Sequence, residues 1–214
     1  MNVVPGSGQP DSHGAGPTSP DLTPVLLAAS KGDEKAWRRI VDLYARRVFA
    51  LAQSRLRNPE VAEEITQSVF ATLAAKLVGG GYTEQGKFEP WLFRIATNRI
   101  RDEQRRTRRH PVNHDAEAVD RVPARKAEAD PNSEQIDRLR AALHQLTDAD
   151  REIIELRHHG QMSFAQLAEM LGEPIGTLLA RHHRALAKLK SLMEMSLTGT
   201  TKSTLGDTLG RAEA

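Results

Sequence analysis

The chain has 214 residues, of which 39% are hydrophobic and 4% aromatic, and its formal net charge is +2. This composition favours two small helical domains over one large core. The absence of cysteine excludes a disulfide scaffold and cysteine-ligated metals. No stretch approaches the roughly 20 apolar residues of a membrane span, and no signal-peptide core opens the chain. We therefore expect a cytoplasmic protein without membrane insertion.

Residues 1–23 contain four glycines and four prolines and almost nothing apolar, which predicts a disordered N-terminal segment. Residues 24–109 have helical periodicity and predict a compact domain. A short helix is expected at 25–30, and Asp33 is the predicted N-cap of a long helix that ends before Asn58. The apolar residues that share one face of this long helix are Trp37, Ile40, Val41, Tyr44, Val48, Leu51 and Ala52.

Two more helices complete this first domain. The third ends at the glycines 79–81, and its apolar residues at helical spacing are Val61, Ile65, Val69, Leu73 and Leu77. After a glycine-rich loop, the fourth helix is expected at about 89–108, and its predicted inward residues are Trp91, Leu92, Ile95 and Ile100. From Trp91 to Arg109 the sequence has seven arginines and two acids. This helix is therefore strongly cationic toward its C-terminal end.

Residues 110–133 carry three prolines and no apolar period, which predicts a linker. A second helical domain is expected at 134–193. Ser133 and Asp148 are the predicted N-caps of helices near 134–145 and 148–158. The side chains expected to face inward from these two helices are Ile136, Leu139, Leu143, Ile153, Ile154 and Leu156. Residues 194–214 are rich in Thr, Gly and Ser and predict a flexible tail.

Residues 163–190 have the pattern of a helix-turn-helix. Gly172 ends the first helix, whose apolar face consists of Phe164, Leu167, Ala168 and Leu171. Pro174 stands where a first helical turn tolerates it. The second helix is expected to bury Ile175, Leu178, Leu186 and Leu189. Its cations are then left to meet phosphates or base edges, and they are Arg181, Arg184, Lys188 and Lys190.

The cations are confined to two separated helices, since residues 134–155 hold six acids and three arginines. Each patch alone is equally consistent with a solvated face and with a nucleic-acid contact. Adjacent histidines at 158–159 and 182–183 point about 100° apart on a helix, so no metal site is expected. No P-loop, nucleophile elbow or dinucleotide fingerprint occurs, and neither a cofactor nor an enzyme activity is predicted.

The order of the motifs resembles the bacterial RNA polymerase sigma factors of the sigma-70 family, in the extracytoplasmic function (ECF) group. The resemblance covers roughly residues 24–193 and rests on VAEEITQSVFATLAAKL, FEPWLFRIATNRIRDEQRRTRR and the segment from LTDADREIIEL to the end of the helix-turn-helix. It implies an all-α fold in which a region 2 bundle (24–109) and a region 4 helix-turn-helix domain (134–193) are joined by a flexible linker.

The resemblance also implies the function and partners. A sigma factor directs promoter-specific initiation by binding the clamp helices and flap of core RNA polymerase, the melted minus-10 element and the minus-35 duplex. An anti-sigma factor is a further implied partner. The alternative from the residues alone is a duplex-binding regulator whose residues 24–109 serve in oligomerisation or sensing.

The implied site residues fall into three groups. Those matching the polymerase contact are Glu63, Glu64, Gln67 and Phe70. Those matching the minus-10 contact are Asn98, Arg101, Asp102, Arg105 and Arg106, with Tyr82 and Lys87 as candidates in the loop that pockets a flipped base. Those nearest the minus-35 groove are Thr177, Leu179, Ala180, Arg181, Arg184 and Lys188. Arg181 is the choice for base readout, because a guanidinium can pair with guanine through two hydrogen bonds. His182 stands where the family usually packs a leucine inward.

Overall fold

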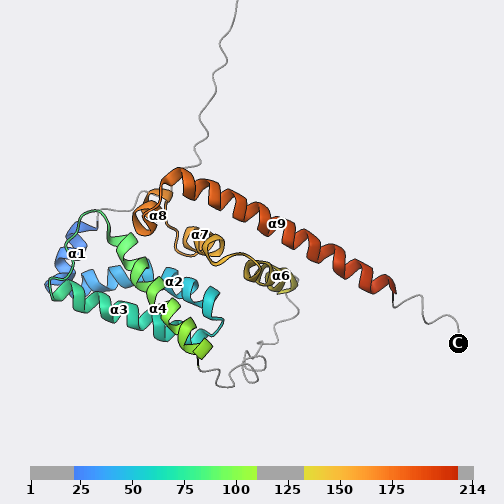
Figure 1. The fold of residues 1–214 in the computed structure, drawn as a ribbon. Helices are drawn as coiled ribbons and strands as arrows, with labels where there is room; N and C mark the ends of the chain where they lie inside the picture. The colour runs from blue at the N-terminus through green and yellow to red at the C-terminus, as the bar shows by residue number, and fades with distance from the viewer. Residues whose placement is uncertain (1–21, 110–132, 207–214) are drawn as a thin grey trace, which may run out of the picture.

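The computed structural model describes residues 22–109 and 133–206, and every regular element in these ranges is a helix (Figure 1). The N-terminal domain consists of α1 (Thr23–Ser30), α2 (Glu34–Leu56), α3 (Pro59–Val78) and α4 (Phe88–Arg109). The C-terminal domain consists of α6 (Ser133–His144), α7 (Asp148–His158), α8 (Phe164–Leu171) and α9 (Ile175–Gly206). The predicted all-α fold with two helical domains is confirmed. The expectations for 1–21, 110–132 and 207–214 lie outside the described residues.

Local capping explains where the helices begin and end. The Asp33 carboxylate accepts from the backbone N–H groups of Lys35 and Ala36 at 2.7 and 3.0 Å, as predicted for an N-cap. Gly172 ends α8 with φ +71°, a conformation that suits glycine. The prediction for Asp148 is wrong, because the hydroxyl of Thr147 caps α7 by accepting from Asp150 N at 3.2 Å. Asp148 instead lies in the first turn, where its charge suits the helix dipole.

The N-terminal domain packs α2, α3 and α4 against one another, with α1 across one end. The predicted inward face of α2 is largely correct, since Ile40, Tyr44, Val48 and Leu51 are almost fully buried. Val41 is the exception. It is 39% exposed because it faces an open groove between α2 and α3 rather than the core.

The C-terminal domain packs α6, α7 and α8 along α9. Its inward stripe on α9 differs from the prediction: Ile175 and Leu186 are 45% and 38% exposed, whereas Leu178, Ala185 and Leu189 are buried. On α6 the predicted Ile136 and Leu139 are also exposed, because the buried contact with α9 is made near the C-terminal end of α6, at Ala142 and Leu143.

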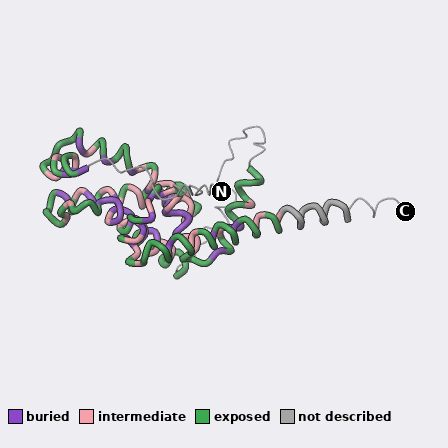
Figure 2. Tube along the Cα trace, turned by 90° about the horizontal axis from the view of Figure 1, so that it is seen from above, coloured by how far each residue is buried: buried purple, intermediate pink, exposed green. Residues whose placement is uncertain are grey.

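The last helix is longer than the sequence suggests. It continues to Gly206, through part of the segment for which the sequence predicts a tail from residue 194. Leu192 and Met193 pack against a buried cluster that α9 forms with α6 and α7. This packing stabilises the helix at the point where the sequence predicts that it ends. Beyond this contact α9 projects from the rest of the molecule (Figure 1). Figure 2 shows exposed and intermediate residues on the stretch of α9 where this projection begins.

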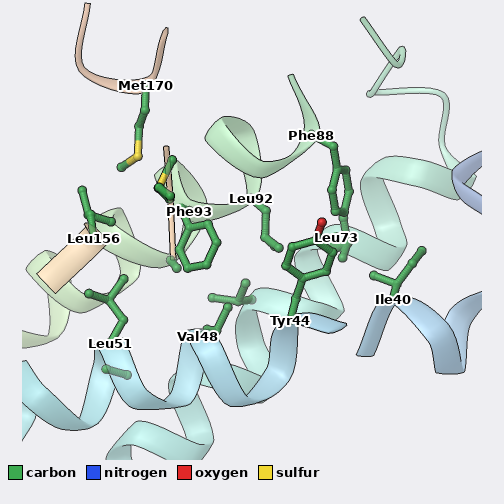
Figure 3. Packing of buried hydrophobic residues seen from close by; sticks show 14 of the residues in the cluster. Ile40, Tyr44, Val48, Leu51, Leu73, Phe88, Leu92, Phe93, Leu156 and Met170 are labelled. Atoms are coloured by element: carbon green, nitrogen blue, oxygen red, sulfur yellow. The ribbon is translucent and has the colours of Figure 1, made fainter. Parts of the chain in front are cut away.

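A single hydrophobic core joins the two domains. Leu156 of α7 and Met170 of α8 belong to the same buried cluster as Leu51 of α2 and Phe93 of α4 (Figure 3). Helix α4 packs on α8, and α2 packs on α7. The chain is therefore closed on itself, with the helix-turn-helix docked against the N-terminal domain.

Candidate polymerase and nucleic-acid interfaces

The residues predicted to contact polymerase lie together on α3. Glu63, Glu64 and Gln67 are exposed, and Phe70 is half-buried. Three of them, Glu63, Gln67 and Phe70, line a mainly apolar groove of about 460 Å³ between α2 and α3. The other lining residues are Val41, Ala45, Arg46, Phe49 and Thr66. A groove with an apolar floor and charged edges suits a helical partner. Sequence reasoning found the α3 edge of this groove and missed the α2 edge.

The residues predicted to contact the minus-10 strand lie on α4. Asn98, Asp102, Arg105 and Arg106 are exposed. Arg106 Nε forms an ion pair with Glu103 at 2.9 Å, and this pairing raises the Arg106 pKa. Arg101 differs from the others because its Nη2 donates to both carboxylate oxygens of Glu152, on α7, at 2.6 and 2.8 Å. The predicted set is therefore brought together on one helix, but one member is already engaged by the other domain.

A second pocket, of about 290 Å³, lies between the glycine-rich loop and the start of α4. The rings of Tyr82 and Trp91 stack in it with centroids 4.2 Å apart. Tyr82 donates its hydroxyl hydrogen to Glu84 at 2.8 Å, and burial together with this acceptor raises the Tyr82 pKa. Lys87, Arg94 and Glu169 also line the pocket, the last of them from α8. Trp91 thus packs against the core, as predicted, while presenting part of its ring to the pocket.

The residues predicted to contact the minus-35 duplex occupy the start of α9. Thr177, Leu179, Ala180, Arg184 and Lys188 are exposed. The expectation that Arg181 is free to meet DNA is not met in this structure. Its two Nη atoms donate to the two carboxylate oxygens of Glu173 at 2.8 and 2.6 Å, which lowers the Glu173 pKa. Glu173 lies in the connecting turn, two residues before the start of α9, and was not among the predicted site residues.

His182 takes an inward position, where the resemblance predicts a leucine. Its ring lies 5.4 Å from the Phe164 ring and 5.9 Å from the His158 ring. Its Nε2 is buried without a hydrogen-bond partner among the described residues. Burial lowers the His182 pKa, and the neighbouring His158, Arg157 and His183 lower it further. Within the described ranges, no three metal-ligating side chains form a group.

Replacing His182 with leucine is expected to raise the free energy of unfolding by about 1 kcal/mol, because it removes an unsatisfied buried nitrogen. The gain should be larger at pH 5.5 than at pH 7.5. A histidine whose folded pKa lies below its ordinary value of about 6.5 binds fewer protons in the folded state. The free energy of unfolding of the wild type therefore falls as the pH drops below about 6.5, because the unfolded state then binds the proton more readily. The leucine variant does not have this loss. Urea unfolding at the two pH values tests this, with exposed His183→Ala as control; equal gains at both would contradict it.

The contacts between the domains involve charged residues that the sequence argument did not single out. Arg55 of α2 donates its Nε hydrogen to Glu155 of α7 at 2.5 Å, and the two side chains are 9% and 2% exposed. Burial raises the Glu155 pKa, and the charge of Arg55 opposes that rise. The Glu152 carboxylate forms ion pairs with two arginines, Arg55 at 4.0 Å and Arg101 at 2.6 Å. The acids of α7 therefore neutralise arginines from two helices of the other domain.

Arg47 is a second link between the domains. Its guanidinium donates to Glu89 of α4 at 2.8 Å and to the carbonyl of Gly160, after α7, at 3.1 and 2.5 Å. Glu89 is buried and accepts from Tyr44 at 3.0 Å and from Gln166 of α8. The sequence signal for this interface is the surplus of acids at 134–155, which includes Glu152 and Glu155. In the sequence alone, this surplus serves only to separate the two basic helices.

Each of the two domains matches the model of a known protein family. The model of Sigma-70 region 2 matches residues 40–110, and the model of Sigma-70 region 4 matches residues 142–191. No helix in 22–109 or 133–206 is long and apolar enough to cross a bilayer.

Among curated proteins, the chain is 31% identical over 195 residues to the ECF RNA polymerase sigma factor SigE of Mycolicibacterium smegmatis, covering 86% of this chain and 73% of SigE. It is 28% identical to the ECF sigma factor SigW of Bacillus subtilis, covering 77% and 92% of the two chains. It is 31% identical to the sigma factor NccH of Alcaligenes xylosoxydans, covering 84% and 98%.

Two solved structures are similar in fold. The Bartonella quintana sigma factor RpoE, crystallised with the anti-sigma factor NepR, has a TM-score of 0.56 and 25% identity over 75% of this chain and 98% of RpoE. A complex of CnrH with the cytosolic domain of CnrY gives a TM-score of 0.60 at 23% identity, covering 82% of this chain and 99% of the matched chain. The matches to both regions, in this order and joined in one chain, show that the protein belongs to the sigma-70 family, in its group of ECF RNA polymerase sigma factors.

Proposed function

We propose that this sigma factor docks on the clamp helices of core RNA polymerase through the α2–α3 groove. The groove carries the proposal, since it combines an apolar floor with exposed Glu63 and Gln67 and the half-buried ring of Phe70. On the α3 side, Glu63 and the adjacent exposed Glu64 suit a basic helical partner, because opposite charges steer association while the apolar floor supplies affinity. Residues 24–109 then act as a polymerase-binding domain rather than in oligomerisation.

The α4 face and the Tyr82–Trp91 pocket are proposed to hold the melted minus-10 strand. Arginines that track phosphates beside aromatic rings that accept bases are the usual means of binding single-stranded DNA. Asn98, Asp102, Arg105 and Arg106 extend this surface along α4, and Lys87 lies at the pocket mouth.

The start of α9 is proposed to read the minus-35 duplex, with the exposed Thr177, Leu179 and Ala180 nearest the base edges. Arg184 and Lys188 are placed one and two turns further along the helix, where they suit phosphate contacts. The flap of core polymerase and an anti-sigma factor complete the proposed partners. The Bartonella quintana structure supports an inhibitor of this kind, since its sigma factor was crystallised with the anti-sigma factor NepR.

Run-off transcription tests the proposed function. Core polymerase with this chain should produce transcripts from a promoter that core alone ignores, and the chain should be retained by clamp helices immobilised on a resin. Tight duplex binding by the chain without any promoter-dependent transcript and without clamp binding would favour a stand-alone regulator.

Replacing Arg181 with alanine is expected to weaken minus-35 duplex binding by about 5- to 150-fold, because one good bidentate pair contributes about 1–3 kcal/mol of discrimination. The loss should concentrate at one base position. Glu173→Ala should have the opposite effect, since it releases the guanidinium that this carboxylate now holds. Fluorescence anisotropy on duplexes selected by the wild-type chain measures both.

Lys188→Ala is the matched control for a phosphate contact. It should weaken all duplexes alike and reduce the salt dependence by about one unit. A uniform loss with Arg181→Ala would instead make Arg181 a phosphate contact and contradict its role in base readout.

A further inference from the structure

The second helix of the helix-turn-helix, α9, begins with a stretch that carries no charge. Residues 175–180 have the sequence IGTLLA, whose one polar side chain is that of Thr177. Ile175 and Leu179 are 45% and 43% exposed, and Thr177 and Ala180 are exposed as well. We call these four residues the apolar tip of α9. Because Ile175 and Leu179 are neighbours at i and i+4, they form one exposed aliphatic surface, which favours a contact with a partner.

The rest of the same helix indicates what kind of partner the tip meets. Residues 181–190 contain no acid and four cations, namely Arg181, Arg184, Lys188 and Lys190. A helix with this density of positive charge suits a polyanion, and duplex DNA carries one negative charge per about 1.7 Å of its axis. A helix-turn-helix places the N-terminal part of its second helix against base edges in the major groove. The charge of α9 therefore favours DNA over a protein as the partner that covers the tip.

An apolar surface can contact only one feature of a base pair favourably. In the major groove every base presents hydrogen-bond donors or acceptors, and thymine alone adds an apolar group, its C5 methyl. The side chains of Ile175, Leu179 and Ala180 have no donor or acceptor for the polar edges. They can bury a methyl group, and one such buried group changes Kd by about fourfold. The thymine methyl is therefore the base feature that matches the tip.

The geometry at the start of α9 strengthens this match. Arg181, the first cation after the tip, has both Nη atoms on the Glu173 carboxylate, so the beginning of the helix has an apolar outer surface in this structure. Ile175 and Leu179 lie about 6 Å apart along the helix axis. Successive base pairs are about 3.4 Å apart, so these two side chains are separated by about two base steps.

We propose that the apolar tip reads thymine methyl groups in the minus-35 duplex, with Leu179 as the principal contact and Ile175 about two base steps away. The inference rests on the proposed role of α9 and adds the class of sequence that this chain selects, a minus-35 element with thymines beside the tip. Arg184 and Lys188 contact phosphates and fix the register in which the methyl groups meet Leu179.

Replacing thymine with deoxyuridine tests the proposal, because it removes the C5 methyl and leaves the hydrogen-bonding edge intact. Core polymerase with this chain first selects promoter duplexes from a randomised library, and fluorescence anisotropy then measures Kd with each minus-35 thymine replaced in turn. We expect Kd to rise about fourfold at one or two thymines and to stay unchanged at the others. Cytosine at a sensitive position should weaken binding, and 5-methylcytosine should restore part of the loss.

The variant Leu179→Ala identifies the residue that reads the methyl. It shortens an exposed side chain, so the helix should stay folded, and thymine and deoxyuridine should then bind with equal Kd at the position that Leu179 reads. Leu186→Ala is the matched control, because Leu186 is 38% exposed on the same helix about two turns further on. This control should keep the sensitivity to the methyl. Leu179→Lys introduces a donor and should change the preferred base at that position from thymine to guanine.

Equal Kd for thymine and deoxyuridine at every position would overturn the proposal. A methyl effect that persists in Leu179→Ala would also overturn it, since another residue would then be the reader. If Leu179→Ala weakens binding to polymerase rather than to DNA, the tip is a protein contact and the proposal is wrong. Promoter-dependent transcription alongside any of these results would retain the proposed function, whereas the absence of any promoter-dependent transcript would remove both.

Discussion

Replacing Phe70 with alanine is expected to weaken binding to the clamp helices by about 30-fold or more and to abolish most promoter-dependent run-off transcription. The ring lies half-buried in the wall of the α2–α3 groove. Aromatic side chains in such positions often contribute 2 kcal/mol or more to an interface, and 2 kcal/mol is about 30-fold in Kd. Gln67→Ala, which removes a polar group from the exposed rim, should have a smaller effect in the same direction.

Two substitutions control the Phe70 measurement. Val78→Ala removes a 64% exposed apolar side chain from the same helix, outside the groove, and should leave clamp binding unchanged. Arg181→Ala should spare clamp binding while impairing minus-35 recognition. A titration in which Phe70→Ala and Arg181→Ala weaken clamp binding equally would refute the assignment of this groove.

Replacing Leu73 with alanine is expected to lower the free energy of unfolding by about 3 kcal/mol, the middle of the range for large-to-small core substitutions. Leu73 is completely buried on α3, in the cluster that joins α2, α3 and α4. Because a domain of this size is stabilised by only about 5–15 kcal/mol, the loss should be visible as a much lower urea midpoint.

Val78→Ala again serves as the matched control, because it shortens an exposed side chain on the same helix and should change stability by less than about 0.5 kcal/mol. A small effect of Leu73→Ala would mean that the N-terminal core is loosely packed. It would then contradict the burial seen at this position.

Local signals in the sequence were sufficient for much of the fold. A short polar residue before a helix and a glycine after one act through their own backbone neighbourhood, which is why Asp33 and Gly172 were placed correctly. The predicted inward face of α2 was correct except at Val41, where the neighbouring helix leaves a groove open. The errors at Ile136, Ile175 and Leu186 have the same origin, because periodicity identifies an apolar stripe but not which part of it a partner helix covers.

The interface between the domains could not be predicted, because its contacts join residues far apart in the chain. Arg55 and Glu155 are 100 residues apart, and Arg47 and the Gly160 carbonyl are 113 apart. From the sequence alone, Arg47, Arg55 and Glu155 cannot be told from ordinary surface charges. The pairing of Arg181 with Glu173 was missed because Glu173 lies in the turn before α9, where the i,i+3 and i,i+4 rule for pairs within a helix does not apply. The predicted polymerase and DNA residues remain proposals, supported by exposure and grouping.

The long sequence separation of these contacts bears on the order of events during synthesis. A bacterial-type ribosome adds about 5–20 residues per second, and domains fold as they emerge. The N-terminal domain is complete at Arg109, whereas the carbonyl of Met170 that holds Arg94 is added 61 residues later. For about 3–12 s on this timescale, each nascent chain carries its arginine-rich helix uncovered, beside the messenger RNA and ribosomal RNA. Self-closure is therefore acquired only late in the chain's production, after a period in which the first domain meets nucleic acid unshielded.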